Sequence, residues 1–477
     1  MALTRILFWL GNTLILMAGL MVLTAILAIA ALETQEATNL GIAAIVASLV
    51  GGMFVLATQN TPSQERNQDA LYFLFLFWII IPLFGALPFL FLGSTDNLLT
   101  AWFEAVSAFT TTGSSTLIPE DQSRALLIWR SILAAFGGVA SATLAVVILA
   151  SLNLAGTGVH RSMLFTLKKG ALFGRLVAIG RIVALIYGLI ALSGFVVMSA
   201  AGARPFDAFC LALSGVATAG LGTQSVPLAE YIGFRPAVVL AIVCMLGAAS
   251  VAVHWDVLRL RNLREAKNFF RNAEHRALFG LAFGLGLIGF SYTGFRHFTT
   301  VSLEATYLVS SAGFDYNVIG LELLPPSVLI AVALIGGAAL STAGGLKLIR
   351  LLLLMRHMRI DIERLSHPSR VKPVRFRGRH IPDSAFLSVW MYFLGYSIVF
   401  GVGIITFSAL GLPFDVAVPA AAGAISNVGP LIDINMVTMN WADFSAAQLL
   451  TSGLLMIIGR VEVLAILAVI TSALAKA

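Results

Sequence analysis

The sequence predicts an all-α polytopic membrane protein with about ten transmembrane helices, and three observations lead to this fold class. Of the 477 residues, 59% are hydrophobic and 11% are charged, whereas soluble domains carry about 25% charged residues. Ten apolar segments are each long enough to cross a bilayer, which requires about 20 residues in a helix. The basic residues gather in a few connections between these segments instead of spreading along the chain.

The ten predicted spans follow one another along the chain. They cover residues 6–32, 39–58, 70–93, 125–152, 174–200, 235–256, 276–294, 326–355, 384–410 and 446–474. The first span is too long for the core of a signal peptide and lacks a clear cleavage site, so it is expected to remain as a helix.

The distribution of charge predicts the orientation of these spans. Segments 160–181, 255–276 and 347–380 contain five, six and ten Lys/Arg residues, together 21 of the 30 in the chain. Acidic residues dominate the connections between the basic segments, so the basic segments are expected on the cytoplasmic side. The number of spans is then even and both termini are cytoplasmic. The net charge of +7 reflects this asymmetry, and no nucleic-acid partner is expected.

Four of the outer connections contain a further apolar piece of about a dozen residues, too short to span the membrane and ending in a glycine. Such pieces predict re-entrant segments. Their glycines, Gly113, Gly220, Gly313 and Gly429, are spaced by 107, 93 and 116 residues, and each is followed 23 to 30 residues later by another glycine. The chain thus reads as an N-terminal hairpin (1–60) and four helix–P-loop–helix repeats around a central pore. The repeats cover 70–155, 174–260, 276–356 and 384–474.

The four re-entrant pieces have the chemistry of a filter for monovalent cations. The C-terminal end of a short helix carries a partial negative charge, and a following glycine lets the backbone turn so that carbonyl oxygens replace a hydration shell. The expected ion-binding residues are Thr111, Thr112, Gly113, Thr218, Ala219, Gly220, Ser311, Ala312, Gly313, Asn427, Val428 and Gly429, none of which is a carboxylate. For a single loop, close helix packing would explain the small residues better. Four aligned loops favour the filter.

Several longer stretches carry a family resemblance. They are FEAVSAFTTTG with LLIWRSILAAFGG, SGVATAG, SSAGF with IGGAALSTAGGLKLIR, and SNVGP with IIGRVEV. The chain resembles the Trk/Ktr/HKT superfamily of potassium transporters, most closely the TrkH-type membrane subunit of bacteria. The resemblance implies K⁺ uptake across the bacterial cytoplasmic membrane, a homodimer with one pore per subunit, and a cytoplasmic nucleotide-binding regulatory subunit similar to TrkA. K⁺ is then the transported ion, and no organic cofactor is expected on this chain.

Three filter positions bear on ion selectivity under this resemblance. In plant relatives, serine in place of the first-loop glycine accompanies Na⁺ transport, and Gly113 is retained here. Ser311 stands where the family usually has threonine, and Ala219 where glycine is common in TrkH-type chains. Both departures leave the neighbouring glycine in place, so they leave open the degree of K⁺ selectivity.

Arg460 lies in the middle of the apolar span 446–474, where a charge costs at least about 2.5 kcal/mol. One interpretation is that it pairs with an acid on an adjacent helix. The other is that it projects below the filter as an electrostatic barrier to cations. The resemblance supports the second, because GRVEV matches the pore arginine motif of the family.

The stretch GGAALSTAGGLK, residues 336–347, interrupts the eighth predicted span. Each glycine in a helix costs about 1 kcal/mol relative to alanine, so four in twelve positions predict a broken helix. Irregular backbone at this depth requires burial in protein or a cavity. We therefore expect an intramembrane gate loop below the filter, with a tight packing kink as the alternative. The expected gate residues are Gly336, Gly337, Gly344, Gly345, Lys347 and Arg460.

The remaining patterns limit the function. A Na⁺-permeable or weakly selective channel of the same fold is the main alternative, and an ion-coupled symporter fits less well because that class usually has two inverted repeats. The chain contains no HExxH, Ser/His or paired-Asp constellation, so no enzyme is expected. Cys210 and Cys244 have neither disulfide nor metal-site spacing. The basic segment 356–380 faces either anionic lipid headgroups or the regulatory subunit.

Overall fold

The computed structural model describes residues 3–59, 67–95, 97–151, 172–260, 267, 269–294, 297–317, 324–367, 375–376, 379–380, 383–434 and 439–461. Within these ranges the regular secondary structure is helical apart from two short strands, β1 (Arg375–Phe376) and β2 (Arg379–His380), which pair antiparallel. The all-α class is therefore confirmed. Most of the basic segment 160–181 and the last part of the predicted span 446–474 lie outside the described residues.

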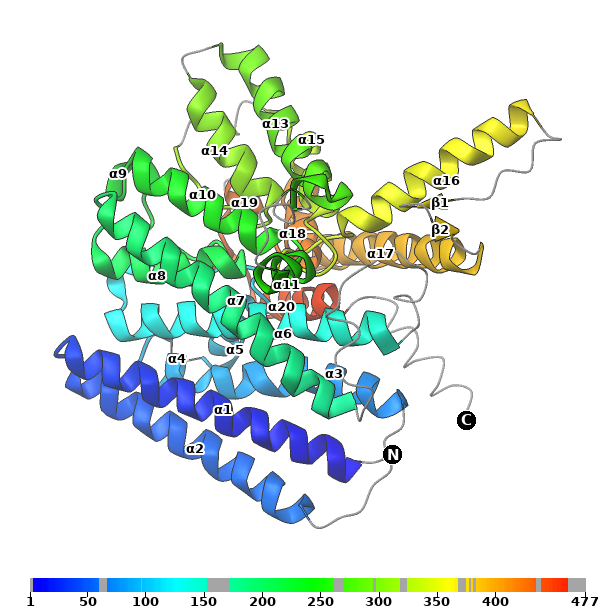
Figure 1. Cartoon of the computed structure of the whole chain (residues 1–477). Coiled ribbons are helices and arrows are strands. Elements are labelled where there is room, and N and C mark those ends of the chain that lie inside the picture. The colour runs from blue at the N-terminus through cyan, green and yellow to red at the C-terminus, as the bar shows by residue number, and fades with distance from the viewer. Residues whose placement is uncertain are drawn as a thin grey trace.

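The N-terminal hairpin consists of α1 (Leu3–Ala30) and α2 (Thr34–Thr58). Gly11 and Gly51 face each other where these helices cross, and a Cβ on Gly11 would lie 2.6 Å from the Gly51 carbonyl oxygen. Small residues at such a crossing let two helix backbones approach closely within a membrane. The hairpin lies along one side of the molecule, where α1 packs on α3 and α6 (Figure 1).

A helix, a short helix and a second helix then follow one another four times. The first unit contains α3 (Asn67–Gly85), α4 (Leu87–Phe91), α5 (Leu98–Phe109), the 3₁₀ turn η1 (Pro119–Asp121) and α6 (Arg124–Ser151). The second contains α7 (Leu172–Ala200), α8 (Pro205–Ala217), α9 (Leu228–Tyr231), α10 (Phe234–Ala248) and α11 (Val251–Leu260). In the third are α13 (Ala273–Thr293), α14 (Phe298–Val309), α15 (Pro326–Ile335) and α16 (Leu348–Ser366). The fourth holds α17 (Asp383–Ala409), α18 (Phe414–Ser426), α19 (Leu431–Ile434), η6 (Trp441–Asp443) and α20 (Ala446–Val461).

Among the described residues, six helices are long and apolar enough to cross a membrane, or seven if the bent pair α10–α11 counts as one span. The other three predicted spans correspond to α13, to the interrupted pair α15–α16 and to α20, whose described part ends at Val461. The interruption between α15 and α16 covers residues 336–347, where the glycine-rich stretch predicted a break.

A second interruption was not predicted from the sequence. The sixth span bends by 96° between α10 and α11. The backbone groups freed by this bend pair with the stretch 336–347, since the Ala338 amide donates to the Ala248 carbonyl (3.0 Å) and the Val251 amide to the Leu340 carbonyl (2.7 Å). The two broken spans therefore satisfy each other's exposed backbone groups, as the membrane interior requires.

Candidate functional site

The predicted filter residues belong to four tetrapeptides, residues 111–114, 218–221, 311–314 and 427–430, and the first residue of each adopts a left-handed backbone conformation. The tetrapeptides follow the short helices α5, α8, α14 and α18, with either no residue or one residue in between. The left-handed residues are Thr111 (φ 54°), Thr218 (φ 54°), Ser311 (φ 62°) and Asn427 (φ 54°). Residues other than glycine rarely adopt this conformation, and those that do gather at functional sites. The same strained turn therefore follows each of the four short helices.

The glycines of the four tetrapeptides are required for two different reasons. Gly113, Gly220 and Gly313 have φ values of 84°, 69° and 67°, which a side chain would strain. Gly429 does not have a positive φ, so the expected glycine turn is absent from the fourth loop. Gly429 is instead needed for close approach, because a Cβ there would lie 2.3 Å from the Ser114 amide nitrogen.

The four loops form a closed ring in chain order. At each step, a Cβ on the glycine of one loop would fall against the next loop. The Cβ would lie 1.8 Å from the Ala219 carbonyl oxygen at Gly113 and 2.0 Å from the Ala312 carbonyl oxygen at Gly220. It would lie 3.3 Å from the Pro430 ring at Gly313 and 2.3 Å from the Ser114 amide nitrogen at Gly429. The fourth loop also bonds to the first, since the Gly429 amide donates to the Thr112 carbonyl (2.7 Å). The four segments are thus brought together around one axis.

In three of the four repeats, the glycine that follows in the next span packs against the end of the short helix. A Cβ would lie 1.7 Å from the Phe109 carbonyl oxygen at Gly137, 2.3 Å from that of Val216 at Gly247, and 2.3 Å from that of Ile425 at Gly459. Each of these carbonyls belongs to the last turn of a short helix. In the third repeat, a Cβ on Gly336 would instead lie 1.9 Å from the Gly344 carbonyl oxygen, because the span is broken there. The fourfold pattern is therefore interrupted where the glycine-rich loop enters.

Several carbonyl groups of the ring are suited to a dehydrated monovalent cation. Ala219, Ala312 and Gly313 are buried, yet no donor among the described residues forms a hydrogen bond with their carbonyl oxygens. Buried carbonyls are nearly always paired, so unpaired ones at a strained turn mark a place where a ligand can substitute for a donor. Rings of such oxygens coordinate monovalent cations without a fixed charge.

The hydroxyl groups of the first loop have protein partners. Thr112 Oγ1 lies 2.7 Å from Thr110 Oγ1 and accepts a hydrogen bond from the Asn427 amide (3.0 Å). The same Asn427 amide donates to the Met456 carbonyl (3.0 Å), which links the first loop to α20 through the fourth. In this conformation, Thr112 therefore connects loops, and both its hydroxyl and its carbonyl are engaged.

Two acidic residues that sequence reasoning missed hold the chain as it leaves the filter. The Glu104 carboxylate accepts from the Thr116 amide (2.6 Å), and that of Glu304 from the Asn317 amide (2.9 Å). Each lies seven residues before the left-handed residue of its loop, so the repeat alignment contained this signal. Beside Glu104, the buried Arg130 donates to the Gly222 carbonyl (2.7 Å) and thereby joins the first repeat to the second.

The connections that follow α5 in the first repeat and α8 in the second also meet, through Glu120. Its two carboxylate oxygens accept from the Ser225 amide (2.6 Å) and the Ser225 hydroxyl (2.7 Å). Partial burial opposes ionisation of this carboxyl, but the two hydrogen bonds from Ser225 outweigh it and lower the pKa of Glu120.

Arg460 reaches from α20 to both the filter and the glycine-rich loop. Its guanidinium donates from Nη1 to the Thr342 carbonyl (2.6 Å), from Nε to the Thr110 carbonyl and from Nη2 to the Thr111 hydroxyl. No carboxylate of the described segments forms an ion pair with it, so its partners in these segments are neutral oxygens. Arg460 thus lies directly against the start of the first predicted filter loop.

The glycine-rich loop 336–347 is buried along its whole length. Its two ends are closed by hydrogen bonds from the Leu346 amide to the Leu334 carbonyl (2.9 Å) and from the Lys347 amide to the Ile335 carbonyl (2.9 Å). Lys347 has a φ of 75°, and its ammonium group donates back to the Ala343 carbonyl. The loop is therefore folded on itself in protein surroundings, with Lys347 immediately before α16.

The tip of this loop touches three of the four filter segments. Thr218 Oγ1 lies 3.2 Å from Thr342 Oγ1, and the Gly344 amide donates to the Ser311 hydroxyl (3.1 Å). A Cβ on Gly344 would lie 1.8 Å from the Ser426 carbonyl oxygen, at the end of α18. Gly337 and Gly345 also leave no room for a side chain, since a Cβ there would lie 2.5 Å and 2.8 Å from other atoms of the loop. A side chain at Gly344 would push the loop away from the end of α18, and side chains at Gly337 and Gly345 would disrupt the fold of the loop itself.

Four helix ends directed at one ring of carbonyl groups, within a bundle of apolar helices, define a cation transport protein of the membrane. The chain belongs to the TrkH family: its sequence matches the profile of that family, described as a cation transport protein, over residues 36–475. The family consists of transporters and not enzymes, and the resemblance inferred from the filter motifs is confirmed.

Individual relatives agree with this assignment. The chain is 29% identical over 441 residues to the Trk system potassium uptake protein TrkH of Escherichia coli K12, covering 89% of this chain and 90% of the relative. It is 28% identical over 446 residues to the protein of the same name from Halomonas elongata, covering 89% of each. The crystal structure of the potassium transporter TrkH from Vibrio parahaemolyticus superposes with a TM-score of 0.88 over 98% of both chains at 24% identity, so the fold is shared.

Proposed function

We propose that this chain takes up K⁺ across the bacterial cytoplasmic membrane through the ring of four loops. The observation that carries the proposal is that the carbonyls of the buried residues Ala219, Ala312 and Gly313 lack donors among the described residues, within a closed ring of strained turns. The relatives reported above are potassium uptake proteins by name, which supports K⁺ as the ion. The first three residues of each tetrapeptide, twelve residues in all, are the proposed filter.

A flux experiment on a matched pair of glycine variants tests this role. Gly113 and Gly93 both have positive φ values, of 84° and 71°, but only Gly113 lies against another filter loop. Gly113→Ala and Gly93→Ala therefore introduce similar backbone strain and differ in filter contact. We expect K⁺ uptake into liposomes to be lost in the Gly113 variant and retained in the Gly93 variant. Equal uptake by both variants would exclude the proposed pathway.

The main alternative is a Na⁺-permeable or weakly selective channel of the same fold. The observation behind it is Ser311, which stands where the family usually has threonine and whose hydroxyl accepts a hydrogen bond from the Gly344 amide in this conformation. Uptake of K⁺, Rb⁺ and Na⁺ measured side by side separates the two. A selective filter gives similar rates for K⁺ and Rb⁺ and little Na⁺ uptake, whereas similar rates for all three ions support the alternative.

The gate is proposed to consist of the loop 336–347 and Arg460, and the described conformation is proposed to be closed. A unit positive charge about 4 Å from a cation opposes it by about 4 kcal/mol at an effective dielectric constant of about 20. Arg460 also ties the loop to the filter through Thr342 and Thr111. Opening then requires the guanidinium to leave these partners and the loop tip to move away from Thr218 and Ser311.

The orientation and partners follow as further proposals. Helix α16 begins directly after the gate loop and carries exposed basic residues, so a cytoplasmic nucleotide-binding subunit similar to TrkA would act on the gate by moving this helix. Figure 1 places α16 beside α17, extending away from the rest of the bundle. We further propose that both termini are cytoplasmic and that the chain forms a homodimer. Labelling of a terminal cysteine tag from either side of the membrane, and native mass spectrometry, test these two points.

A further inference from the structure

A groove between the N-terminal hairpin and the first two repeats is separate from the filter. Its walls come from α1, α3, α6, α7 and α8, and its volume is about 760 Å³. This volume lies within the range of roughly 300–1,000 Å³ found for sites that bind small organic molecules. Residues along its rim, including Leu16, Leu23 and Val177, are exposed, so the groove opens on the surface that faces lipid.

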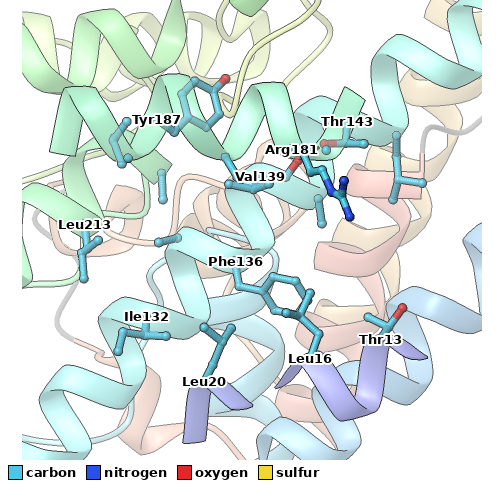
Figure 2. A pocket seen from close by; sticks show the side chains of 18 of the residues that line it. Thr13, Leu16, Leu20, Ile132, Phe136, Val139, Thr143, Arg181, Tyr187 and Leu213 are labelled. Atoms are coloured by element: carbon cyan, nitrogen blue, oxygen red, sulfur yellow. Dashed lines mark hydrogen bonds between the residues drawn. The ribbon is translucent and has the colours of Figure 1, made fainter. Parts of the chain in front are cut away.

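The groove is apolar except at one end, where it contains an arginine. Figure 2 shows Arg181 of α7 at that end with Thr13 and Thr143, and Ile132 and Leu213 at the other end. The hydroxyls of Thr13 and Thr143 donate to carbonyls of their own helices, so Arg181 is the charged donor of the lining. Among the described residues, no acceptor forms a hydrogen bond or ion pair with its side chain.

The position of Arg181 along α7 corresponds to the depth of a lipid phosphate. From Arg181 to Ala200, the outer end of the helix, the rise is about 29 Å at about 1.5 Å per residue. The hydrocarbon core of a bilayer is about 30 Å thick. With Ala200 at one boundary of the core, Arg181 lies at the other, and the apolar part of the groove runs from there into the acyl-chain region.

We propose that this groove binds an anionic phospholipid, with the phosphate on Arg181 and the acyl chains along α1, α6 and α7. The charge of Arg181 complements the phosphate, because a guanidinium and a phosphate form charge-assisted hydrogen bonds. The apolar walls complement the chains. The inner wall includes Val216 and Ala217, the two residues before filter residue Thr218, so a bound lipid packs against the support of the second filter loop.

Native mass spectrometry of the full chain, titrated with phosphatidylglycerol and with phosphatidylcholine of the same acyl chains, tests this site. Arg181→Gln removes the phosphate partner, and Arg259→Gln removes an exposed arginine elsewhere as the charge-matched control. We expect Arg181→Gln to weaken phosphatidylglycerol binding at least about tenfold, the loss of one hydrogen bond to a charged group. Binding to the Arg259 variant should stay at the wild-type level.

A second variant tests the acyl-chain part of the groove independently. Gly188 lines the groove and has open space around it, so Gly188→Leu places a side chain where the acyl chains would lie. This variant should weaken the binding of both phospholipids while leaving Arg181 in place, and Ala184→Leu repeats the test if Gly188→Leu melts at a lower temperature. Equal phosphatidylglycerol binding by the Arg181 and Arg259 variants would overturn the proposal. So would displacement of the lipid by free glycerol phosphate, or unchanged binding to the groove-filling variants.

Discussion

Replacing Arg460 with alanine is expected to make the transporter leak. In the described conformation, proposed to be closed, the guanidinium donates hydrogen bonds to Thr110, Thr111 and Thr342, and these join the first proposed filter loop to the proposed gate loop 336–347. A hydrogen bond to a charged group contributes about 1.5–3 kcal/mol, and in the open state water replaces these partners. If the three hydrogen bonds together lower the free energy of the closed state relative to the open state by about 1.5–3 kcal/mol, their loss raises the open population roughly 10- to 100-fold.

The assay is K⁺ or Rb⁺ efflux from liposomes containing the purified chain without any regulatory subunit. Arg124→Ala serves as the control, because Arg124 lies at the start of α6 and its guanidinium stacks on the Phe206 ring, away from the filter and the gate loop. Arg460→Lys should leak less than Arg460→Ala, since lysine keeps the positive charge but cannot reproduce the planar set of donors. Efflux from Arg460→Ala at the wild-type rate, with an unchanged melting temperature, would refute this account of the gate.

Three further predictions address the gate loop and the support of the filter. Gly344→Ala should raise efflux, because a Cβ would lie 1.8 Å from the Ser426 carbonyl oxygen and displace the loop; wild-type efflux would count against the gate contact. Glu104→Gln should lower the free energy of unfolding by about 1–3 kcal/mol through loss of one of two buried acceptor oxygens, measured by thermal unfolding in detergent. Wild-type protein should be more stable than Glu120→Gln at pH 7, and this difference should disappear as the pH falls below the ordinary carboxyl range, because Ser225 lowers the pKa of Glu120. A difference that grows on acidification would contradict the last prediction.

The helices and the repeat were predictable because they depend on local properties of the chain. A run of about 20 apolar residues predicts a span, and four short apolar pieces that each end in glycine at similar spacing predict a repeated short helix and loop. The break at 336–347 was predictable for the same reason, since its four glycines disfavour a helix wherever the segment lies. The family assignment then confirmed the resemblance based on these motifs.

The bend between α10 and α11 could not be predicted, because it depends on contacts about 90 residues away. The stretch 234–260 contains no proline after Pro236 and only Gly247 as a glycine, so it reads as one helix. Its bend is stabilised by hydrogen bonds of Ala248 and Val251 with the gate loop, which local sequence does not contain. The same holds for Gly429, whose requirement comes from the proximity of Ser114 and not from its own backbone angle.

The acidic residues that support the filter were missed for a different reason. A single acid in a short apolar segment, such as Glu104 or Glu304, has the pattern of a helix end near the membrane surface. Only the structure shows that both carboxylates are buried and accept hydrogen bonds from the backbone that follows the filter. Their equal spacing from Thr111 and Ser311 is the signal that a closer comparison of the repeats would have used.

The most direct test of the proposed filter is the position of bound ions in a crystal structure of the full chain grown with Rb⁺ or Tl⁺. These ions substitute for K⁺ and can be located by anomalous scattering. If the ring of four loops is the filter, anomalous density lies inside it, within coordination distance of the Ala219, Ala312 and Gly313 carbonyl oxygens. Ordered ions found only outside this ring, at an occupancy that follows the salt concentration, would contradict it.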